Sequence, residues 1–197
     1  MQDIVIAGCG AVGSRLALEC AAPGLSFLLI DDDRVDGNNV RSGSTIFWSQ
    51  HVGSYKVQAL GEMLYRRFGC LSHTDHATLT ERRVREYHGF AGARVVVDGF
   101  DNVEARLLTT QAAVPVLHVG VSAQGTGGVL WGANYEFPEN PVPRGENPVC
   151  THALGRSIIT FTASIAALVL TEYLESGRMR SFVTTRNLDL IPIGRLD

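Results

Sequence analysis

The sequence predicts a Rossmann-like α/β fold built on a doubly wound, mostly parallel sheet. Apolar runs of strand length alternate with segments of helical periodicity over about the first 120 residues, which is typical of a parallel sheet with helices on both faces. A glycine-rich turn joins the first apolar run to the first helical segment. The second run ends in an acidic residue, Asp31, as the glycine-rich βαβ fingerprint requires.

The first four elements follow from where apolar residues recur. Residues 3–8 form a short apolar run that predicts a buried strand, and residues 11–22 have apolar positions at helical spacing. Residues 25–30 are continuously apolar, which suits a strand buried on both faces. Residues 53–68 again show helical spacing, so a second long helix is expected there.

The middle of the chain continues the alternation. A short charged helix is expected at 82–89, after a strand that we presume near His73. The run RVVV at 94–97 predicts another buried strand, and a helix is expected at 102–112. The apolar run at 114–119 completes this series of strands.

The last third of the chain changes character. Residues 120–157 are rich in Gly and Pro and predict a crossover loop of unusual length, and such loops tend to be functional. An apolar helix is expected at roughly 158–175, followed by short antiparallel strands at 181–186 and 188–194. No linker divides the sequence, so residues 1–197 are predicted to form a single domain.

Composition excludes several classes of protein. The 197 residues carry a formal charge of −3, so there is no basic excess to bind nucleic acid. The longest apolar stretch, 158–170, is shorter than the roughly 20 residues of a membrane span, so we expect no membrane segment. The N-terminus does not resemble a signal peptide, and the cysteines form no CxxC pair. These features predict a cytoplasmic protein.

The first turn has the sequence of a nucleotide site. Gly8, Gly10 and Gly13 form a GxGxxG motif between a strand and a helix, which is the context that this motif requires. Gly8 would permit the tight turn, Gly10 would leave room for a phosphate, and Gly13 would allow the helix to pack on the strand. Asp31 would accept hydrogen bonds from a ribose and repel a 2′-phosphate, which leaves NAD and ATP as candidates.

Charged segments after the strands favour ATP over NAD. Three such segments are 31–41, 52–56 and 98–102. Each lies where the carboxyl end of a strand or the start of the next helix is expected, and ligands bind at that edge. There the segments would gather Arg41, Lys56, Asp31 and Asp101 around one nucleotide. Two cations and a lone carboxylate suit a triphosphate with Mg²⁺, whereas hydride transfer needs no such charges.

These segments resemble the ThiF/MoeB/HesA family, which is related to the ubiquitin-activating enzymes. The similarity covers Ile4 to about Leu174 and comprises GCGAVG, the segment from Asp31 to Arg41, VGxxK ending at Lys56, and DGFDN followed by Arg106. The resemblance implies Mg-ATP-dependent adenylation of the C-terminal carboxylate of a ubiquitin-like or sulfur-carrier protein. It also implies a homodimer or a heterodimer with another subunit.

The resemblance further implies roles for individual residues. The glycines and Asn39 would lie at the phosphates, Asp31 at the ribose, and Asp101 at Mg²⁺. The residues implied to bind the cofactor are Gly8, Gly10, Gly13, Asp31, Asp33, Asn38, Asn39, Arg41, Lys56, Asp101 and Asn102. The residues implied to be catalytic are Arg41, Lys56, Asp101 and Cys150.

The chain also departs from the family pattern. Members often have an N-terminal helix whose arginine reaches the ATP of the partner subunit, and here we expect that this arginine is either missing or comes from elsewhere. The two CxxC pairs that commonly hold zinc are absent, so we predict no zinc site. Arg41 lies one residue nearer to Asp31 than is usual, so either Asn38 or Asn39 is the matching asparagine.

Cys150 has two interpretations. It lies where some family members carry a cysteine that accepts the activated carboxylate, and a position near a helix N-terminus favours the thiolate. It could equally be a small residue that packs the loop. We interpret Cys9, Cys20 and Cys70 as structural and His118 as a core histidine.

Three other functions stay open at this point. The chain could be a non-catalytic subunit of a heteromeric complex. It could adenylate a modified tRNA base, although its charge argues against that. It could also be an NAD-dependent oxidoreductase, which would leave Lys56, Arg41 and Asp101 without a role.

Overall fold

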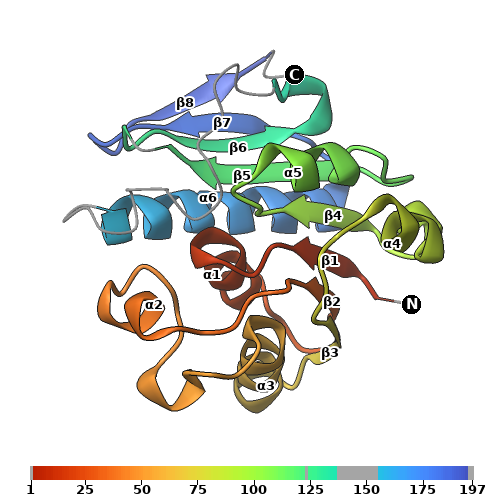
Figure 1. The fold of residues 1–197 in the computed structure, drawn as a ribbon. Helices are drawn as coiled ribbons and strands as arrows, with labels where there is room; N and C mark the ends of the chain where they lie inside the picture. The colour runs from red at the N-terminus through yellow and green to blue at the C-terminus, as the bar shows by residue number, and fades with distance from the viewer. Residues whose placement is uncertain (1, 123, 137–154, 195–197) are drawn as a thin grey trace.

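The computed structural model describes residues 2–122, 124–136 and 155–194, and this part of the chain forms one sheet of eight strands (Figure 1). The strands are β1 (Ile4–Ala7), β2 (Ser26–Ile30), β3 (Leu71–Asp75), β4 (Val95–Asp98), β5 (Val116–Val121), β6 (Gly127–Trp131), β7 (Ser181–Thr184) and β8 (Leu190–Ile193). Their order is β3-β2-β1-β4-β5-β6-β7-β8, parallel from β3 to β5 and antiparallel from β5 to β8. The predicted fold class is therefore confirmed.

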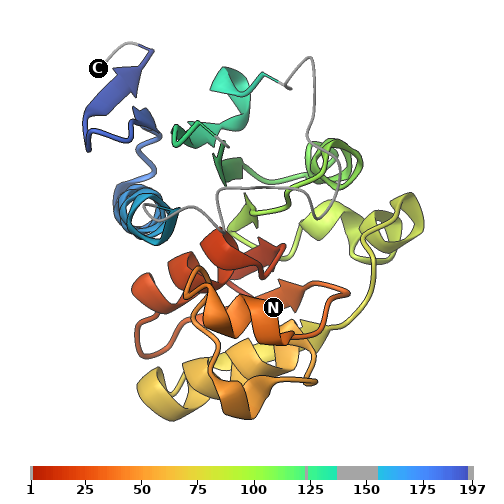
Figure 2. The ribbon, with the colours of Figure 1, turned by 60° about the vertical axis from the view of Figure 1, so that its left-hand side comes forward.

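Helices cover both faces of this sheet. The α-helices are α1 (Ala11–Glu19), α2 (Gly37–Arg41), α3 (Lys56–Phe68), α4 (Glu81–Glu86), α5 (Val103–Thr109) and α6 (Gly155–Ser176), and the 3-10 turns are η1 (Ser49–His51), η2 (His88–Phe90) and η3 (Gly132–Asn134). The apolar cores place α1, α3 and α6 on one face, with α4 and α5 on the other (Figure 2). This is the layering that a doubly wound sheet requires.

The alternation of side chains along β1 explains the two cores. Ile4 and Ile6 point into the core beneath α1, α3 and α6, whereas Val5 and Ala7 point into the core beneath α4 and α5. All four are almost fully buried. A strand covered on both faces reads as a continuous apolar run, because neither face contacts water. This is why the first strand could be predicted from sequence.

Helix boundaries differ from the predictions where turns intervene. The helix predicted at 53–68 begins at Lys56, because Gly53 adopts a φ of 90° and Tyr55 forms an isolated bridge with Arg34. The helix predicted at 82–89 ends at Glu86, and the turn that follows contains Gly89 with a φ of 62°. Such left-handed backbone angles cannot continue an α-helix.

The other helices and strands shift by a few residues at each end. The helix predicted at 11–22 ends at Glu19, and the one predicted at 102–112 spans Val103–Thr109. The strands predicted at 3–8, 25–30, 94–97 and 114–119 correspond to β1, β2, β4 and β5, and the strand expected near His73 is β3. The two strands predicted after the long helix correspond to β7 and β8.

The predicted crossover loop at 120–157 is partly wrong. It contains β6, which pairs with β5 and β7, and the turn η3. The loop prediction extended over this strand because β6 begins with two glycines, which are depleted in strands. At Gly127 a glycine is needed, because a Cβ there would lie within 2.2 Å of the hydroxyl oxygens of both Thr162 and Thr184. Residues 137–154, with Cys150, lie outside the described residues.

The long helix α6 fixes the orientation of the last layer. It is long and apolar enough to cross a membrane by length and composition, contrary to the expectation from the stretch 158–170. Its buried side chains, however, pack on α1 and on β5 and β6, so we interpret it as a core helix. Near its C-terminal end, the guanidinium of Arg94 donates to the carbonyl of Leu174. Because Arg94 directly precedes β4, the other end of α6 lies toward the carboxyl edge of the sheet.

Candidate functional site

The glycine loop lies at the switch point of the sheet, where β1 pairs with β2 on one side and β4 on the other. Gly8 has a φ of 94°, and a Cβ there would lie 2.7 Å from the backbone of Gly99. A Cβ at Gly13 would lie 2.0 Å from the carbonyl oxygen of Gly8. Around Gly10, in contrast, a Cβ would meet nothing within 4 Å. Gly8 and Gly13 therefore serve backbone packing, while Gly10 borders open space.

The N-terminus of α1 is available to an anion. Gly10 is the residue before the helix, no side chain caps it, and no acidic residue lies in the first turn. The first amide groups of a helix have no partners within the helix and lie at the positive end of its dipole. They can therefore donate to a phosphate or a carboxylate.

Asp31 holds the glycine loop in place. One carboxylate oxygen accepts from the backbone N–H of Cys9 at 2.6 Å, and the other accepts from the N–H of Asp33 at 2.8 Å. The side chain is buried, and burial raises its pKa above the usual range, although the charge of Lys56 opposes this rise. Asp31 thus has a structural role in addition to the ribose contact that the sequence predicts.

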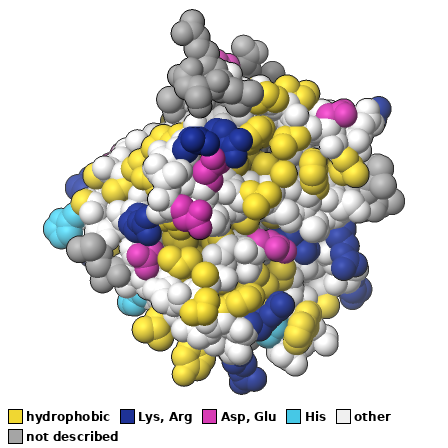
Figure 3. All heavy atoms as spheres, turned by 180° about the vertical axis from the view of Figure 1, so that it is seen from behind, with side chains coloured by type: hydrophobic (Ala, Val, Ile, Leu, Met, Phe, Trp, Pro, Cys, Tyr) yellow, Lys and Arg dark blue, Asp and Glu magenta, His cyan; other side chains and the backbone are white. Residues whose placement is uncertain are grey.

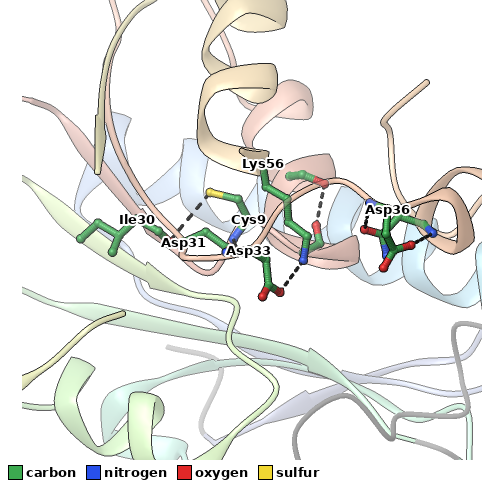
Figure 4. A network of polar contacts seen from close by, with 9 residues as sticks. Cys9, Ile30, Asp31, Asp33, Asp36 and Lys56 are labelled. Carbon is green, nitrogen blue, oxygen red and sulfur yellow. Dashed lines mark hydrogen bonds and ion pairs between the residues drawn. The ribbon is translucent and has the colours of Figure 1, made fainter. Parts of the chain in front are cut away.

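Lys56 is the only lysine of the chain. It begins α3, and its ammonium contacts the carboxylate of Asp33 at 2.7 Å, as Figure 4 shows. Burial by itself would lower its pKa, but the charge of Asp31 and the hydrogen bond to Asp33 outweigh burial and raise the pKa. The structure thus brings Asp31, Asp33 and Lys56 together beside the glycine loop, with a cation held charged in a mostly buried position.

Arg41 makes its hydrogen bond within its own helix, α2. Its guanidinium donates to the side-chain oxygen of Asn38 at 2.7 Å and is exposed. Asn39 is also engaged, because it closes a capping box with Asp36 at the start of α2. The structure thus shows Arg41 in contact with Asn38, and its place beside a bound nucleotide stays a prediction. The cap and last turn of the short helix α2 use these polar groups locally.

The two residues predicted at the end of β4 have different surroundings. Asp101 is exposed, and no hydrogen bond or ion pair of its side chain is found within the described part of the chain. Asn102 caps α5, because its side-chain oxygen accepts from the N–H of Ala105 at 2.9 Å. Asp101 is thus free to contact a ligand, whereas Asn102 primarily positions the helix.

A buried polar cluster beside the site was missed from sequence. Asp98, fully buried at the end of β4, contacts the Nδ1 atom of His118 at 2.7 Å and the guanidinium of Arg106 at 3.5 Å. Arg106 also donates to the carbonyl of Val119, and Tyr135 stacks on His118 with ring centroids 4.0 Å apart. His118 is buried as predicted, but it is a partner of Asp98. The register between β4 and β5 places these two residues opposite each other, and no sequence signal fixes that register.

Asp98→Asn is expected to lower the free energy of unfolding by about 3 kcal/mol, because losing one member of a buried charge pair leaves its partner uncompensated. For a protein of this size that corresponds to roughly 6–12 °C in Tm. Asp101→Asn is the matched control, since Asp101 is exposed and is expected to change Tm little. Thermal unfolding followed by circular dichroism measures both, and equal shifts would show that the Asp98 cluster does not stabilise the fold.

Comparisons with known proteins place this chain in a family. The profile of the ThiF family matches residues 1–187. The chain belongs to the ThiF family. The resemblance to the ThiF/MoeB/HesA family is therefore confirmed. A comparison with the sequences of curated proteins gives no match.

Solved structures show the same ThiF-type fold. E. coli MccB with MccA-N7isoASN is similar with a TM-score of 0.75 and 12% identity over 98% of this chain and 64% of that chain. PaaA has a TM-score of 0.73 and 16% identity over 98% of this chain and 64% of its own chain. E. coli MccB with ATP has a TM-score of 0.72 and 15% identity over 98% of this chain and 63% of the MccB chain. The chain thus spans less than two thirds of the length of these proteins, and identities this low show the fold alone.

Among the described carboxylates of this ThiF-family chain, Asp101 best fits a magnesium ion that is also held by phosphates. Mg²⁺ prefers oxygen ligands and usually keeps several waters while binding one or two carboxylates plus phosphate oxygens. Asp101 offers such a carboxylate at the ligand edge. The carboxylates of Asp31, Asp32 and Asp33 also lie within 4.8 Å of one another, but Asp33 pairs with Lys56 and Asp32 accepts from Thr78. Asp101 is therefore the better candidate.

The described cysteines of this ThiF domain are structural. Cys9, Cys20 and Cys70 are buried and free. Burial, with the charge of Asp31 adding to it, raises the pKa of Cys9 well above its ordinary value, and burial raises that of Cys20 to about 12. Thiols with raised pKa values are poor nucleophiles near neutral pH. The two interpretations of Cys150 stay open, because it lies outside the described residues.

Proposed function

We propose that this chain is an ATP-dependent adenylyltransferase that activates the C-terminal carboxylate of a ubiquitin-like or sulfur-carrier protein. One observation carries the proposal: an uncapped helix N-terminus, Gly10 with open space, and a buried Lys56 held by Asp33 adjoin one another at the switch point. Membership of the ThiF family supports adenylation as the type of chemistry. MccB has been solved with ATP and with MccA, which supports a nucleotide and a polypeptide as substrates.

The reaction needs charge stabilisation rather than a base. A carboxylate oxygen of the substrate attacks the α-phosphorus of ATP and forms an acyl-phosphate bond. The bond from the α-phosphorus to the bridging oxygen breaks, and pyrophosphate leaves with that electron pair. The substrate carboxylate is already ionised near neutral pH, so no proton has to move before the attack. The enzyme accelerates this step by binding the phosphate oxygens with fixed donors and cations.

The residues of this chain would divide these tasks. The amides at the start of α1 would donate to the phosphates, and Lys56 would bring a positive charge beside them. Asp33 and Asp31 keep Lys56 protonated and fix its position, because both act to raise its pKa. Asp101 would hold Mg²⁺, which when bound neutralises phosphate charge.

The position of Arg41 fits the proposal if it swings on nucleotide binding. It is exposed and held by one hydrogen bond to Asn38, and an exposed hydrogen bond of this kind contributes only about 1 kcal/mol. A triphosphate would offer a stronger partner than an amide oxygen. An Arg41 that stays at Asn38 would instead favour a non-catalytic subunit, which is the second candidate function.

Thermal shift with Mg-ATP, NAD and NADP tests which nucleotide binds. A ligand at 100 times its Kd stabilises the folded state by about 2.7 kcal/mol, or several degrees in Tm at roughly 2–4 °C per kcal/mol. Of the three ligands, only Mg-ATP is expected to raise Tm, and the rise is expected to be smaller in Asp101→Ala. Stabilisation by NAD but not ATP would overturn the proposal and favour an oxidoreductase.

Isotope exchange between pyrophosphate and ATP then tests the chemistry. The exchange is expected to depend on an added carrier protein with a free C-terminus and to disappear when that C-terminus is amidated. If a short peptide supports the exchange and none of the carrier proteins does, the substrate is a peptide and not a carrier protein. Binding of Mg-ATP without exchange for any candidate substrate would favour the non-catalytic subunit.

A further inference from the structure

Two arginines from different helices approach one short loop at the ligand edge. Arg15 lies on α1, and its Nη2 atom is 3.5 Å from the carbonyl oxygen of Ser44. Arg156 is the second residue of α6, and a Cβ placed on Gly43 would lie 3.6 Å from its Cδ and 3.7 Å from its Nη1. Both side chains therefore border residues 42–44, which directly follow α2.

These two arginines have no acidic partner among the described residues. Neither forms an ion pair there, and the Nε atom of Arg15 is buried without a hydrogen-bond partner in that part of the structure. Burial and then the nearby charge of Arg156 lower the pKa of Arg15, while Glu19 opposes this without forming an ion pair. Like charges near a buried, unsatisfied donor destabilise a fold unless an anion compensates them.

The surroundings of this arginine pair favour an anion. The hydroxyl oxygens of Ser42 and Ser44 lie 2.7 Å apart in the loop that both arginines border. Since α6 has its C-terminal end at the amino edge, the N-termini of α1 and α6 both face the carboxyl edge, so the positive ends of both helix dipoles do so too. Figure 1 places the start of α6 on the side of α2, and Figure 3 shows basic side chains along that edge.

We propose that Arg15 and Arg156 form an anion site that binds the pyrophosphate end of the nucleotide. The choice of nucleotide rests on the proposed function, whereas the anion site rests on the arginine pair itself. At 1.5 Å per residue, Arg15 lies about 7.5 Å along α1 from Gly10, and helical side chains lean toward the N-terminus. A polyphosphate anchored at Gly10 can therefore extend toward both guanidinium groups, which bind phosphate through paired N–H donors.

The site gives the leaving group a binding place of its own. When the bridging bond breaks, the departing pyrophosphate gains negative charge, and two guanidinium groups stabilise that charge. AMP lacks these phosphates and reaches only the glycine loop. The arginine pair is therefore a specificity element that distinguishes ATP from AMP.

Calorimetric titrations with inorganic pyrophosphate, Mg-ATP and AMP test the site. Arg15→Gln and Arg156→Gln are each expected to lower the affinity for pyrophosphate and for Mg-ATP about tenfold, and the affinity for AMP less than about twofold. The reason is that a charged hydrogen bond is lost only for ligands whose phosphates reach the arginines. Arg15→Lys is expected to restore part of the affinity. Arg82→Gln is the matched control, because Arg82 pairs with Glu86 on the exposed face of α4, and it is expected to change nothing.

The outcomes separate this site from the adenylation proposal. Pyrophosphate binding that depends on the arginines, without any pyrophosphate–ATP exchange, would keep the anion site and refute adenylation. Exchange at wild-type rates in both glutamine variants, with unchanged affinities, would refute the anion site and keep adenylation. Equal losses of affinity for AMP and for ATP in the arginine variants would also refute the anion site. So would a wild-type protein that does not bind pyrophosphate. Because Arg156 is exposed, its variant is expected to fold even if Arg15→Gln does not.

Discussion

Gly13→Ala is expected to unfold the domain, whereas Gly10→Ala is expected to leave it folded and unable to bind nucleotide. A Cβ at Gly13 would lie 2.0 Å from the backbone carbonyl oxygen of Gly8 in the same tight turn. Neither residue can move without separating α1 from β1. Overpacking of this kind costs at least about 1–3 kcal/mol even in an adaptable core, and more where the obstacle is backbone.

Gly10 provides the opposite case within the same motif. Its φ is −73°, and a Cβ there would meet nothing within 4 Å. The free energy of unfolding is therefore expected to change by less than about 1 kcal/mol. The added methyl group would nevertheless point toward the space that a phosphate needs, so Mg-ATP is expected to give no thermal shift.

Circular dichroism with and without Mg-ATP measures both effects of the glycine variants. A folded Gly13→Ala protein that binds Mg-ATP would show that the turn can adapt and that its glycine is dispensable. A Gly10→Ala protein with full affinity would show that the phosphates do not approach this part of the loop. Gly128→Ala is a suitable control, because the nearest atom to its Cβ would be 3.5 Å away on a flexible leucine.

The parallel half of the fold was predictable because its residues obey simple periodicities. β1, β2 and β4 are buried on both faces, so each contains a continuous apolar run. The glycine loop was predictable because close backbone packing fixes the positions of Gly8 and Gly13 in the motif. The short helix α2 was missed, since five residues carry no apolar periodicity. Its signal was a capping pair three residues apart, Asp36 and Asn39.

The site was predictable only where chain order determines position. Asp31, Asp33 and Lys56 follow strand ends or begin helices, and the structure brings them together. The direction of Arg41 could not be predicted, because it depends on a local hydrogen bond to Asn38. The pairing of Asp98 with His118 depends on the register between β4 and β5, which sequence spacing does not determine.

Lys56→Met is expected to reduce pyrophosphate–ATP exchange by at least about a hundredfold, the usual effect of removing one fixed donor to a developing charge. Methionine retains most of the side-chain volume, so packing at the start of α3 is preserved. Asp33 would lose its contact with the ammonium of Lys56, and Asp31 would lose the main charge that opposes the rise of its pKa. Lys56→Arg keeps the charge but not the compact ammonium, and an intermediate rate is expected.

The single lysine allows the pKa of Lys56 to be measured directly. In protein labelled with ¹³C-lysine, one side-chain signal reports the titration of Lys56, and its pKa is expected above the ordinary value of 10.5. Asp31→Asn is expected to lower this pKa, since the Asp31 carboxylate is the largest contribution that raises it. A pKa at or below 10.5 in the wild type would show that burial outweighs the two carboxylates.

The raised pKa also determines how stability depends on pH. The folded state holds the proton of Lys56 more tightly than the unfolded chain does. The resulting stabilisation is complete below pH 10.5 and is lost as pH rises through the pKa of the folded state. Lys56→Met lacks this contribution, so its deficit in unfolding free energy is expected to shrink above pH 10.5. A deficit that stays constant with pH would mean that the methionine variant is destabilised by packing and not by the lost charge.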